Sequence, residues 1–441
     1  RVSPEGRALE DPRRSTPRTD NVLAEPSVRE AALRLGPGMV KQTVVSVLDR
    51  CRSGEITPAD VVPLVLASLP EGASSLRRVV NATGVVVHTN LGRAPLSEAA
   101  VDALTVAAGA TDVELDLATG RRDRRGRGTL AALAAAVPDA GDLHVVNNGA
   151  AALALVTRAL AAGRNVVVAR GEMVEIGDGF RIPELVESMG ATLREVGTTN
   201  RVRLADYEAA IDADTGFVLK VHPSNFVVSG FTSTVSVAEL ATLPVPVVAD
   251  IGSGLLAPHP RLPDEPNAAT SLRSGAALVT ASGDKLLGGP QCGLLLGEAS
   301  LVASLRRHPF ARALRVVKLT MAALEATLTG PTPPVPAALA GDPEDLMRRA
   351  RQICAELGGT VSAEPVPSSA AVGGGGAPGV VLPSAAVALP PELAEPLRMG
   401  QPAVVGHVER GRLLLDLIAV PAAADTTVVE AVRRAAKTVQ D

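Results

Sequence analysis

The sequence predicts an α/β protein whose main domain is a mostly parallel sheet with helices on both faces. Two observations support this class of fold. Between Leu143 and Ala249, short and fully apolar strand-like runs alternate with helical stretches, a pattern typical of parallel sheets that are covered on both sides. Polar, glycine-containing segments follow directly after most of these runs. Because ligands of such sheets bind beyond the carboxyl ends of the strands, we expect a site at that edge.

The individual elements follow from apolar runs and from breaks at Gly, Asn and Pro. The predicted strands are Leu143–Val146, Asn165–Ala169, Thr192–Val196, Gly216–Val221, Val245–Ala249, Ala276–Thr280 and Gly293–Leu296. Predicted helices include Ser97–Gly109 and Gly177–Met189, and another opens at Asn147–Ala151. The segments expected at the ligand-binding edge are Asn147–Ala151, Arg170–Glu175, His222–Asn225, Asp250–Gly254 and Ser282–Lys285.

The chain divides into four predicted parts. Residues 1–26 are charged, contain prolines and lack periodicity, which predicts a disordered leader. Residues 27–75 have a helical pattern and form a small N-terminal domain, and residues 76–330 form the large domain. Residues 331–441 are predicted to be a smaller α+β domain, with helices at Pro343–Leu357 and Thr426–Thr438. Within it, the four-glycine run Gly373–Gly376 is interpreted as a flexible connector rather than a loop of the active site.

Composition narrows the function classes. The 441 residues are 46% hydrophobic, with no Trp, one Tyr and five Phe, which argues against aromatic stacking on nucleic acid. A net charge of −4 excludes a general polyanion binder, so DNA is not an expected partner. Three scattered cysteines offer neither a disulfide framework nor metal-ligand spacing. No signal peptide and no apolar run of ~18–20 residues is visible, so we expect a cytoplasmic protein without a membrane span.

Two basic regions have open interpretations. The helical domain is only mildly basic, and an oligomerisation or packing role is as well supported as RNA binding. The run Arg121–Arg127 is interpreted as a solvated loop, with a phosphate contact as the less favoured alternative.

The main candidate for chemistry is Lys285, which lies in a short turn between two buried strands. A lysine held in this way can form a Schiff base with a carbonyl cofactor. Taken alone the lysine is weak evidence, because most lysines beside glycines are solvated turn residues. Asp284 precedes it and would help to tune its basicity.

The other strand-end segments supply what a pyridoxal 5'-phosphate site needs. Asp250 follows a buried strand and could keep the pyridine nitrogen protonated. Asn225 could donate to the phenolic oxygen of the ring, with His222 close by, and Ser282 could bind the phosphate. The remaining phosphate ligands would be backbone groups at the start of a helix, provided by Asn147, Asn148, Gly149 and Ala150. The order phosphate loop, Asn, Asp, Lys and small C-terminal domain is that of aminotransferase-like (fold type I) pyridoxal enzymes.

Several long blocks, in order from about Arg77 to Val420, resemble one family, the bacterial selenocysteine synthases (L-seryl-tRNA(Sec) selenium transferases). The blocks are V-V-N-A-T-G-V-V-V-H-T-N-L-G-R-A-P-L, R-G-E-M-V-E-I-G, V-H-P-S-N-F-V-V-S-G-F-T, S-G-D-K-L-L-G-G-P-Q-C-G and R-A-L-R-V-V-K-L-T-M-A-A-L-E-A-T-L. The N-terminal helical domain resembles the family's tRNA-binding domain more loosely.

The resemblance implies a mechanism. Lys285 would hold pyridoxal phosphate as an internal aldimine, be displaced by the amino group of serine esterified to tRNA(Sec), and then remove the Cα proton. Loss of the hydroxyl would give aminoacrylyl-tRNA, to which selenium from selenophosphate adds. Arg93, Arg312 and Arg315 match the positions that the family uses for the anionic donor, the last two on one face of a predicted helix. The family's assemblies imply a homo-oligomer built from dimers, with a decameric ring among the possible sizes.

Three residues depart from the family pattern and concern details of the substrate site. They are Gly149 in the phosphate loop, Thr129 where a histidine is usual, and Ile418 where an arginine is common. No aromatic is placed to stack on the cofactor ring, so a residue within Glu172–Ile176 is the expected cover. Two alternatives stay open: a related pyridoxal lyase acting on a small amino acid or amino sugar, and a non-catalytic tRNA-binding relative.

Overall fold

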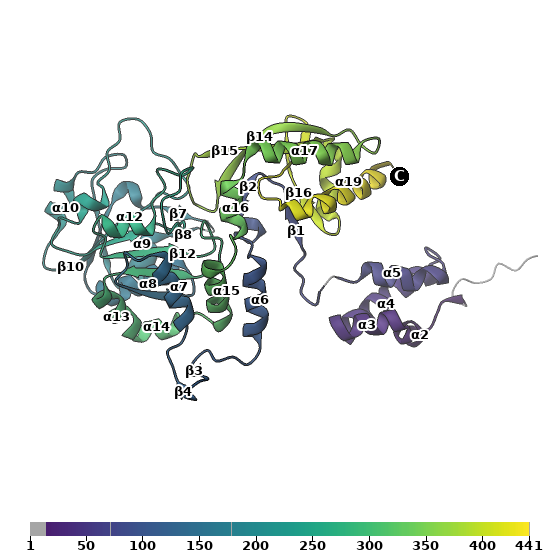
Figure 1. Ribbon diagram of the computed structural model, residues 1–441, viewed down its shortest axis with the longest axis horizontal. Helices are drawn as coiled ribbons and strands as arrows, with labels where there is room; N and C mark the ends of the chain where they lie inside the picture. The colour runs from purple at the N-terminus through teal and green to yellow at the C-terminus, as the bar shows by residue number, and fades with distance from the viewer. Residues whose placement is uncertain (1–14, 71, 178, 441) are drawn as a thin grey trace, which may run out of the picture. The chain divides into compact units, whose positions relative to one another are not determined.

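The computed structural model of the chain describes residues 15–70, 72–177 and 179–440 (Figure 1). It divides into two compact units, one of Arg1–Val79 with Gln401–Ala403 and one of Val80–Gly400 with Val404–Asp441. In the part of the chain that is described, no helix is both long and apolar enough to cross a membrane.

The smaller unit is a helical bundle. Its helices are α2 (Thr19–Ala24), α3 (Pro26–Leu35), α4 (Pro37–Arg52) and α5 (Val61–Ser68), the last preceded by the 3₁₀ turn η1 (Pro58–Asp60). Val28, Val40 and Val61 are fully buried at its centre. The bundle begins earlier than predicted, because α2 lies inside the region interpreted as a disordered leader and buries Val22. Residues 1–14 of that leader lie outside the described residues.

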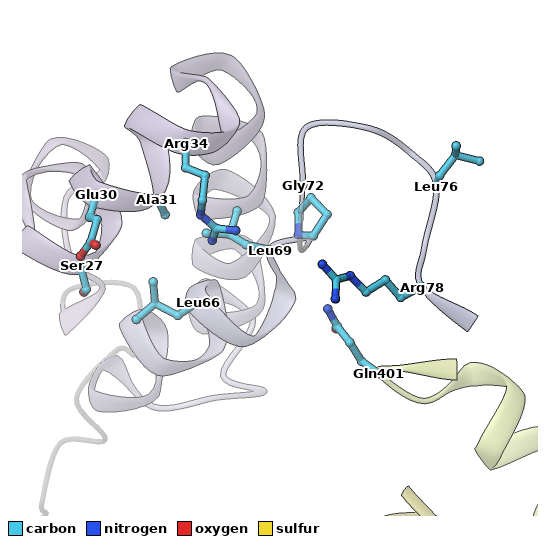
Figure 2. Close-up of a pocket in the computed structure, with 11 residues that line it drawn as sticks. Ser27, Glu30, Ala31, Arg34, Leu66, Leu69, Gly72, Leu76, Arg78 and Gln401 are labelled. Carbon is cyan, nitrogen blue, oxygen red and sulfur yellow. The ribbon is translucent and has the colours of Figure 1, made fainter. Parts of the chain in front are cut away.

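A pocket of about 740 Å³ opens on this unit between the helices and the chain segment that leaves them. Figure 2 shows the guanidinium groups of Arg34 and Arg78 directed towards it, with Glu30 and Gln401 also among its lining residues. The pocket therefore combines two cations with the apolar ends of Leu66 and Leu69.

The larger unit is built on a seven-stranded sheet in the order β5-β13-β12-β11-β10-β6-β9. The strands are β5 (Asp142–Val146), β6 (Asn165–Ala169), β9 (Thr192–Val196), β10 (Thr215–Val221), β11 (Val247–Asp250), β12 (Leu278–Ser282) and β13 (Gly293–Gly297). Only β13 runs against the others. The predicted α/β class and the predicted strands are confirmed, with bounds that differ by one or two residues.

Helices cover both faces of this sheet, and they form three apolar clusters with it. The covering helices are α7 (Arg127–Ala136), α8 (Gly149–Leu160), α9 (Ile182–Ser188), α10 (Leu204–Ala210), α11 (Val237–Leu240), α12 (Ala268–Arg273), α13 (Ala299–Arg307) and α14 (Pro309–Ala313). Helix α9 starts later than predicted, because Glu175–Arg181 forms a short hairpin of β7 (Glu175–Ile176) and β8 (Phe180–Arg181) instead. A second hairpin, β3 (Leu115–Asp116) with β4 (Arg121–Arg122), holds part of the basic run (Figure 1).

A five-stranded sheet, β17-β18-β15-β14-β2, forms the predicted small α+β part. Its strands are β2 (Val85–Val87), β14 (Glu364–Gly373), β15 (Val381–Leu389), β17 (His407–Glu409) and β18 (Arg412–Asp416), and α17 (Pro343–Leu357) and α19 (Asp425–Gln440) pack on it. Strand β2 comes from the segment assigned by sequence to the large domain, and it pairs in parallel with β14. The long β14–β15 hairpin was not predicted, because its Pro and Ala residues blur the alternation of a strand.

Two helices lie in the chain between a strand of one sheet and a strand of the other, and they pack on each other (Figure 1). They are α6 (Glu98–Ala108), which was predicted, and α15 (Lys318–Thr329). Shorter helices, α16 (Pro334–Ala340) and α18 (Ala394–Met399), complete the unit.

Candidate active site

Three neighbouring parallel strands end at the same edge of the sheet, β10 and β11 level with each other and β12 two residues further on, and they position the site. In the register of the sheet, Val221 of β10 lies opposite Asp250 of β11, and Asp250 lies opposite Thr280 of β12. The residues that follow these strands therefore meet at one edge. Lys285 comes close enough to His222 and to Asp250 to influence the pKa of both. The structure thus brings together the strand-end segments from which the sequence predicts a site.

Lys285 lies in a tight turn that several backbone hydrogen bonds hold in place. Gly288 donates to the carbonyl of Lys285 at 3.0 Å, Leu286 donates to Ser253 at 2.9 Å, and Gly283 donates to Cys292 at 2.9 Å. Gly288 has a φ of +74°, a conformation that a residue with a side chain adopts only with strain. The lysine is consequently 8% exposed rather than solvated. The common interpretation of a lysine beside glycines, a solvated turn, does not hold here.

The surroundings of Lys285 favour a neutral amine. Burial lowers its pKa from the ordinary value of 10.5, and Arg93 lowers it further, whereas Asp250, Asp284 and Glu265 oppose the shift. A buried lysine with a lowered pKa is a better nucleophile and proton acceptor than a solvated one. The chemistry expected of Lys285 therefore agrees with its environment.

Asp250 is held at the end of β11 by a neighbouring hydroxyl. Thr280 Oγ1 donates to Asp250 Oδ1 at 2.9 Å. Burial raises the pKa of this carboxyl, and the hydrogen bond from Thr280 and the charge of Lys285 oppose the increase. A buried carboxyl of this kind is suited to sharing a proton with a basic ring nitrogen.

The start of α8 forms a cradle beside Ser282. Asn148 caps the helix by accepting from Ala151 N at 2.7 Å, which leaves the first N–H groups, those of Gly149 and Ala150, directed outwards from the helix. A Cβ on Gly149 would lie 2.6 Å from Ser282 Oγ, so any other residue would fill the cradle. Asn147 is fixed by donating its N–H to Leu314 at 3.1 Å.

Buried polar atoms around Lys285 have no hydrogen-bond partner among the described residues. They are His222 Nδ1, Ser224 Oγ, Ser253 Oγ and Glu265 Oε1. Since buried polar groups are normally paired, such a cluster indicates a ligand. Together with the cradle at Gly149 and the carboxyl of Asp250, these groups fit a planar cofactor that carries a phosphate, a basic ring nitrogen and a ring hydroxyl.

The side chain of Asn225 makes a contact that the sequence analysis did not predict. Its Nδ2 donates to the carbonyl of Glu175 at 2.9 Å, which ties the side chain to the β7–β8 hairpin. His222, the first residue after β10, takes the strand-end position. It is the better candidate of the two for contact with the cofactor ring.

Arg93 and Asp284 link the segment after β2 to the lysine turn. Arg93 Nη1 lies 2.7 Å from Asp284 Oδ2, and Ala94 N donates to the Asp284 carbonyl at 3.2 Å. Arg93 itself has a φ of +66°, a conformation that is uncommon outside glycine and is often found at functional sites. The arginine therefore contacts the residue that precedes Lys285.

Arg312 and Arg315 do not share one helix face, so that prediction is wrong. Helix α14 ends at Ala313, and Arg315 instead forms a β-bridge with Val146 and an ion pair with Glu114. Both arginines lie near Arg125 and lower its pKa, after burial as the main cause. Arg93 is therefore separate from the other three arginines. Arg125, Arg312 and Arg315 lie together beside the end of β5.

The basic run is largely paired rather than free. Arg125 Nη2 donates to the Val316 carbonyl at 2.8 Å, Arg122 lies 3.1 Å from Glu114, and Arg127 lies 3.1 Å from Asp112. These pairs argue for a structural role for part of the run, which the sequence analysis interpreted as a solvated loop.

The remaining departures from the family pattern are buried in packing. Thr129 Oγ1 lies 3.0 Å from the Met321 carbonyl and 3.2 Å from Glu325 Oε2 and can donate to either, which joins α7 to α15. Ile418 is 6% exposed and donates its N–H to Asp416 Oδ1 at 3.0 Å. It also lines a cavity of about 550 Å³ that contains Arg349 and Glu98.

Glu172 is the buried charged residue of the Glu172–Ile176 segment. It forms an ion pair with Lys220 and accepts from Val221 N at 2.9 Å. This pair borders a cavity of about 400 Å³, which His222 and Glu265 also line. Sequence reasoning missed Lys220 and Glu265. A lysine inside the apolar run Gly216–Val221 was a usable signal, whereas Glu265 lies in a proline-containing loop without any pattern.

Comparisons with known proteins show which family the chain resembles. Residues 79–421 match the family model of L-seryl-tRNA selenium transferase, and residues 13–52 match that of the selenocysteine synthase N terminal. The L-seryl-tRNA(Sec) selenium transferase of Carboxydothermus hydrogenoformans is 40% identical, covering 93% of this chain and 95% of its own. That of Moorella thermoacetica is 42% identical, covering 92% and 93%. Among solved structures, a D-glucosaminate-6-phosphate ammonia-lyase is similar in fold, with a TM-score of 0.60 and 19% identity over 83% of this chain and 97% of that one.

Proposed function

Because this chain belongs to the L-seryl-tRNA selenium transferase family, we propose that it converts the serine on tRNA(Sec) into selenocysteine. Pyridoxal phosphate would be the cofactor and selenophosphate the selenium donor. The observation that carries the proposal is the buried Lys285, with its lowered pKa, among unpaired polar atoms at the ends of three neighbouring parallel strands.

The residues around Lys285 fit each part of the cofactor. The N–H groups of Gly149 and Ala150 and the hydroxyl of Ser282 would hold its phosphate. The carboxyl of Asp250 would share a proton with the ring nitrogen, and His222 would contact the ring. When bound, pyridoxal phosphate supplies an electron sink that makes the Cα–H bond of the seryl group acidic.

Lys285 would then act as the proton carrier of the site. Its Nζ is a proton acceptor when neutral, and the lowered pKa increases the neutral fraction near pH 7. Arg93 lowers the pKa of Lys285 and Asp284 raises it. The two members of this ion pair therefore have opposite effects on the lysine. Proton return from Nζ to the departing hydroxyl would complete its part in the elimination.

Arginines would bind the anionic selenium donor. Arg93 lies beside the lysine turn, whereas Arg312 and Arg315 lie near the end of β5 and the cradle of α8. We infer that a homo-oligomer forms, as the family resemblance implies, and that it works in the cytoplasm, where charged tRNA is used. The helical N-terminal unit, with Arg34 and Arg78 at its pocket, would bind tRNA(Sec).

One assay separates this function from a pyridoxal lyase of small molecules. Purified protein is given either seryl-tRNA(Sec) or free serine, each with and without selenophosphate, and the products are identified. We expect selenocysteyl-tRNA(Sec) only with the charged tRNA and the donor together. The Lys285→Ala variant, which loses the reacting amine, is the control. Turnover of free serine or of an amino sugar, with none of seryl-tRNA(Sec), would contradict the proposal.

A further inference from the structure

A glycine-rich segment, Gly373–Ala377, passes directly beside the reactive lysine. We call it the strap. It leaves the end of β14, and a Cβ built on Gly375 would lie 3.6 Å from Lys285 Nζ and 3.3 Å from Ser224 Cβ. Gly375 has a φ of +75°, so a side chain there is disfavoured by conformation as well as by space. The prediction of a flexible connector is wrong, because the run forms one wall of the site.

The strap is seated along its length on the elements around the site. Gly373 pairs with Val87 of β2, a Cβ on Gly374 would lie 2.9 Å from Val87 Cβ, and a Cβ on Gly376 would lie 3.2–3.4 Å from the side chain of Leu286. Contacts this close leave no room for a side chain at Gly373 and Gly374 and little room at Gly376. Four glycines in a row therefore serve close approach to the lysine turn, not freedom of movement.

A buried carboxylate on the other side of the site anchors the end of the strap. Glu265 Oε2 accepts from Ala377 N at 2.7 Å, and the Glu265 side chain is 1% exposed. The same oxygen lies 3.7 Å from His222 Nε2. One carboxylate thus holds both the strap and the histidine that follows β10.

Within the described part of the chain, polar atoms around the strap and the lysine lack hydrogen-bond partners. Glu265 Oε1, His222 Nδ1 and Ser224 Oγ are buried there without a partner among the described residues. A turn that only closed the β14–β15 hairpin would need neither a buried carboxylate from a distant loop nor unpaired polar atoms beneath it. The arrangement indicates a role in substrate binding.

We propose that Glu265 is a positioning residue that holds the strap over Lys285, and that the strap sets the size of the amine admitted to that lysine. The missing side chain of Gly375 leaves room for the substituent on the carbon beside the amine, which in the substrate is an ester rather than a small carboxylate. This inference rests on the proposed function, since it takes Lys285 to carry pyridoxal phosphate.

The first test uses two amines of different size that release the cofactor from Lys285. The rates at which hydroxylamine and O-benzylhydroxylamine remove the visible band of the bound cofactor are compared. Gly375→Ala should slow the bulky probe about tenfold relative to the small one, the effect of about 1.4 kcal/mol on a barrier. Gly359→Ala is the matched control, because Gly359 has a φ of +80° but nothing within 4 Å of a Cβ. It should leave the ratio of rates unchanged.

The second test releases the anchor. Glu265→Ala should raise the rate of the bulky probe about tenfold, as expected when one hydrogen bond to a charged group is lost. Glu265→Gln should restore the wild-type ratio, because its amide oxygen can still accept from Ala377 N. A variant that keeps the visible band has kept its site, and Gly375→Ala decides the question if Glu265→Ala does not fold.

The outcomes separate the two proposals. Wild-type protein that forms no visible band with pyridoxal phosphate would overturn the proposed function, and the role of the strap with it. A normal band combined with unchanged rate ratios in Gly375→Ala and Glu265→Ala would overturn the role of the strap alone. Equal effects of Gly375→Ala and Gly359→Ala would also overturn it, since backbone strain would then be the cause.

Discussion

Two lysines, Lys285 and Lys220, lie at the carboxyl ends of neighbouring parts of the same sheet but have opposite surroundings. Lys220 forms an ion pair with Glu172 and donates to Thr234 Oγ1 at 3.2 Å. Lys285 lies among unpaired polar atoms, and burial lowers its pKa. A paired lysine stays charged and ties elements together, whereas a buried lysine in a site with unmet hydrogen bonds is available for chemistry. The environment, and not the residue type, separates structure from function.

The strongest test of this contrast removes each lysine in turn. Lys285→Ala should abolish the visible cofactor band and reduce turnover of seryl-tRNA(Sec) by at least ~10³-fold, because the covalent anchor and proton acceptor are both lost. Absorbance spectra and single-turnover assays measure the two effects. Lys220→Met is the matched control and should keep the band. A band that survives in Lys285→Ala would show that the cofactor is anchored elsewhere.

Lys220 should instead matter for stability. Lys220→Met leaves the carboxylate of Glu172, which is 7% exposed, without its cation. Breaking a buried pair in this way costs about 3 kcal/mol in the free energy of unfolding. Urea unfolding at neutral pH measures the loss. Adding Glu172→Gln should recover most of it, since the amide can still accept from Val221 N. Unchanged stability in the single variant would show that the pair is not structural.

Arg312 and Arg315 should affect only the second step of the reaction, the addition of selenium. Arg312→Ala with Arg315→Ala should raise the selenophosphate concentration needed for half-maximal rate by about tenfold to 100-fold, the effect of one or two charge-assisted hydrogen bonds. Dehydration of the seryl group should be spared. Following the two steps separately in a rapid-quench assay measures this. A normal yield of selenocysteyl-tRNA(Sec) at low donor concentration would contradict the assignment.

The pH dependence of stability should report on the burial of Lys285. Because the pKa of Lys285 in the folded protein lies below 10.5, the unfolded chain binds more protons in the window between the two values. Stability of the cofactor-free protein should therefore rise with pH through that window. Lys285→Met should be more stable than wild type at neutral pH, and the difference should shrink as the pH approaches 10.5. Urea unfolding at several pH values measures it, and a difference that grows with pH would contradict the argument.

The smallest effect on lysine chemistry is expected from the N-terminal unit. Deleting residues 1–69 should leave the cofactor band and its probe reactivity unchanged, because the lysine turn belongs to the other compact unit. Binding of tRNA(Sec) should be lost, as measured by filter binding at fixed salt. Unchanged tRNA affinity after the deletion would show that this unit has another role.

Much of the large domain could be predicted because its signals are local. Asn165–Ala169 and Thr192–Val196 coincide with β6 and β9, since a buried parallel strand is a continuous apolar run with clear ends. The residues that follow such strands can be read from the sequence alone, which is why Asp250, Ser282 and Lys285 were identified as candidates. The β14–β15 hairpin was missed for the opposite reason, because its apolar pattern is interrupted by proline.

The sequence by itself determined the class of fold, the order of the strands that position the site, and the lysine expected to react. Only the tertiary structure decided which polar groups surround that lysine. Glu265 and Gly375 reach it from segments 20 residues before and 90 residues after it in the chain, and no local pattern encodes such contacts. The same holds for Arg315, which pairs with Glu114 rather than continuing a helix. Burial and pairing depend on neighbours that are distant in sequence, so the pKa of a lysine becomes known only when the chain is folded.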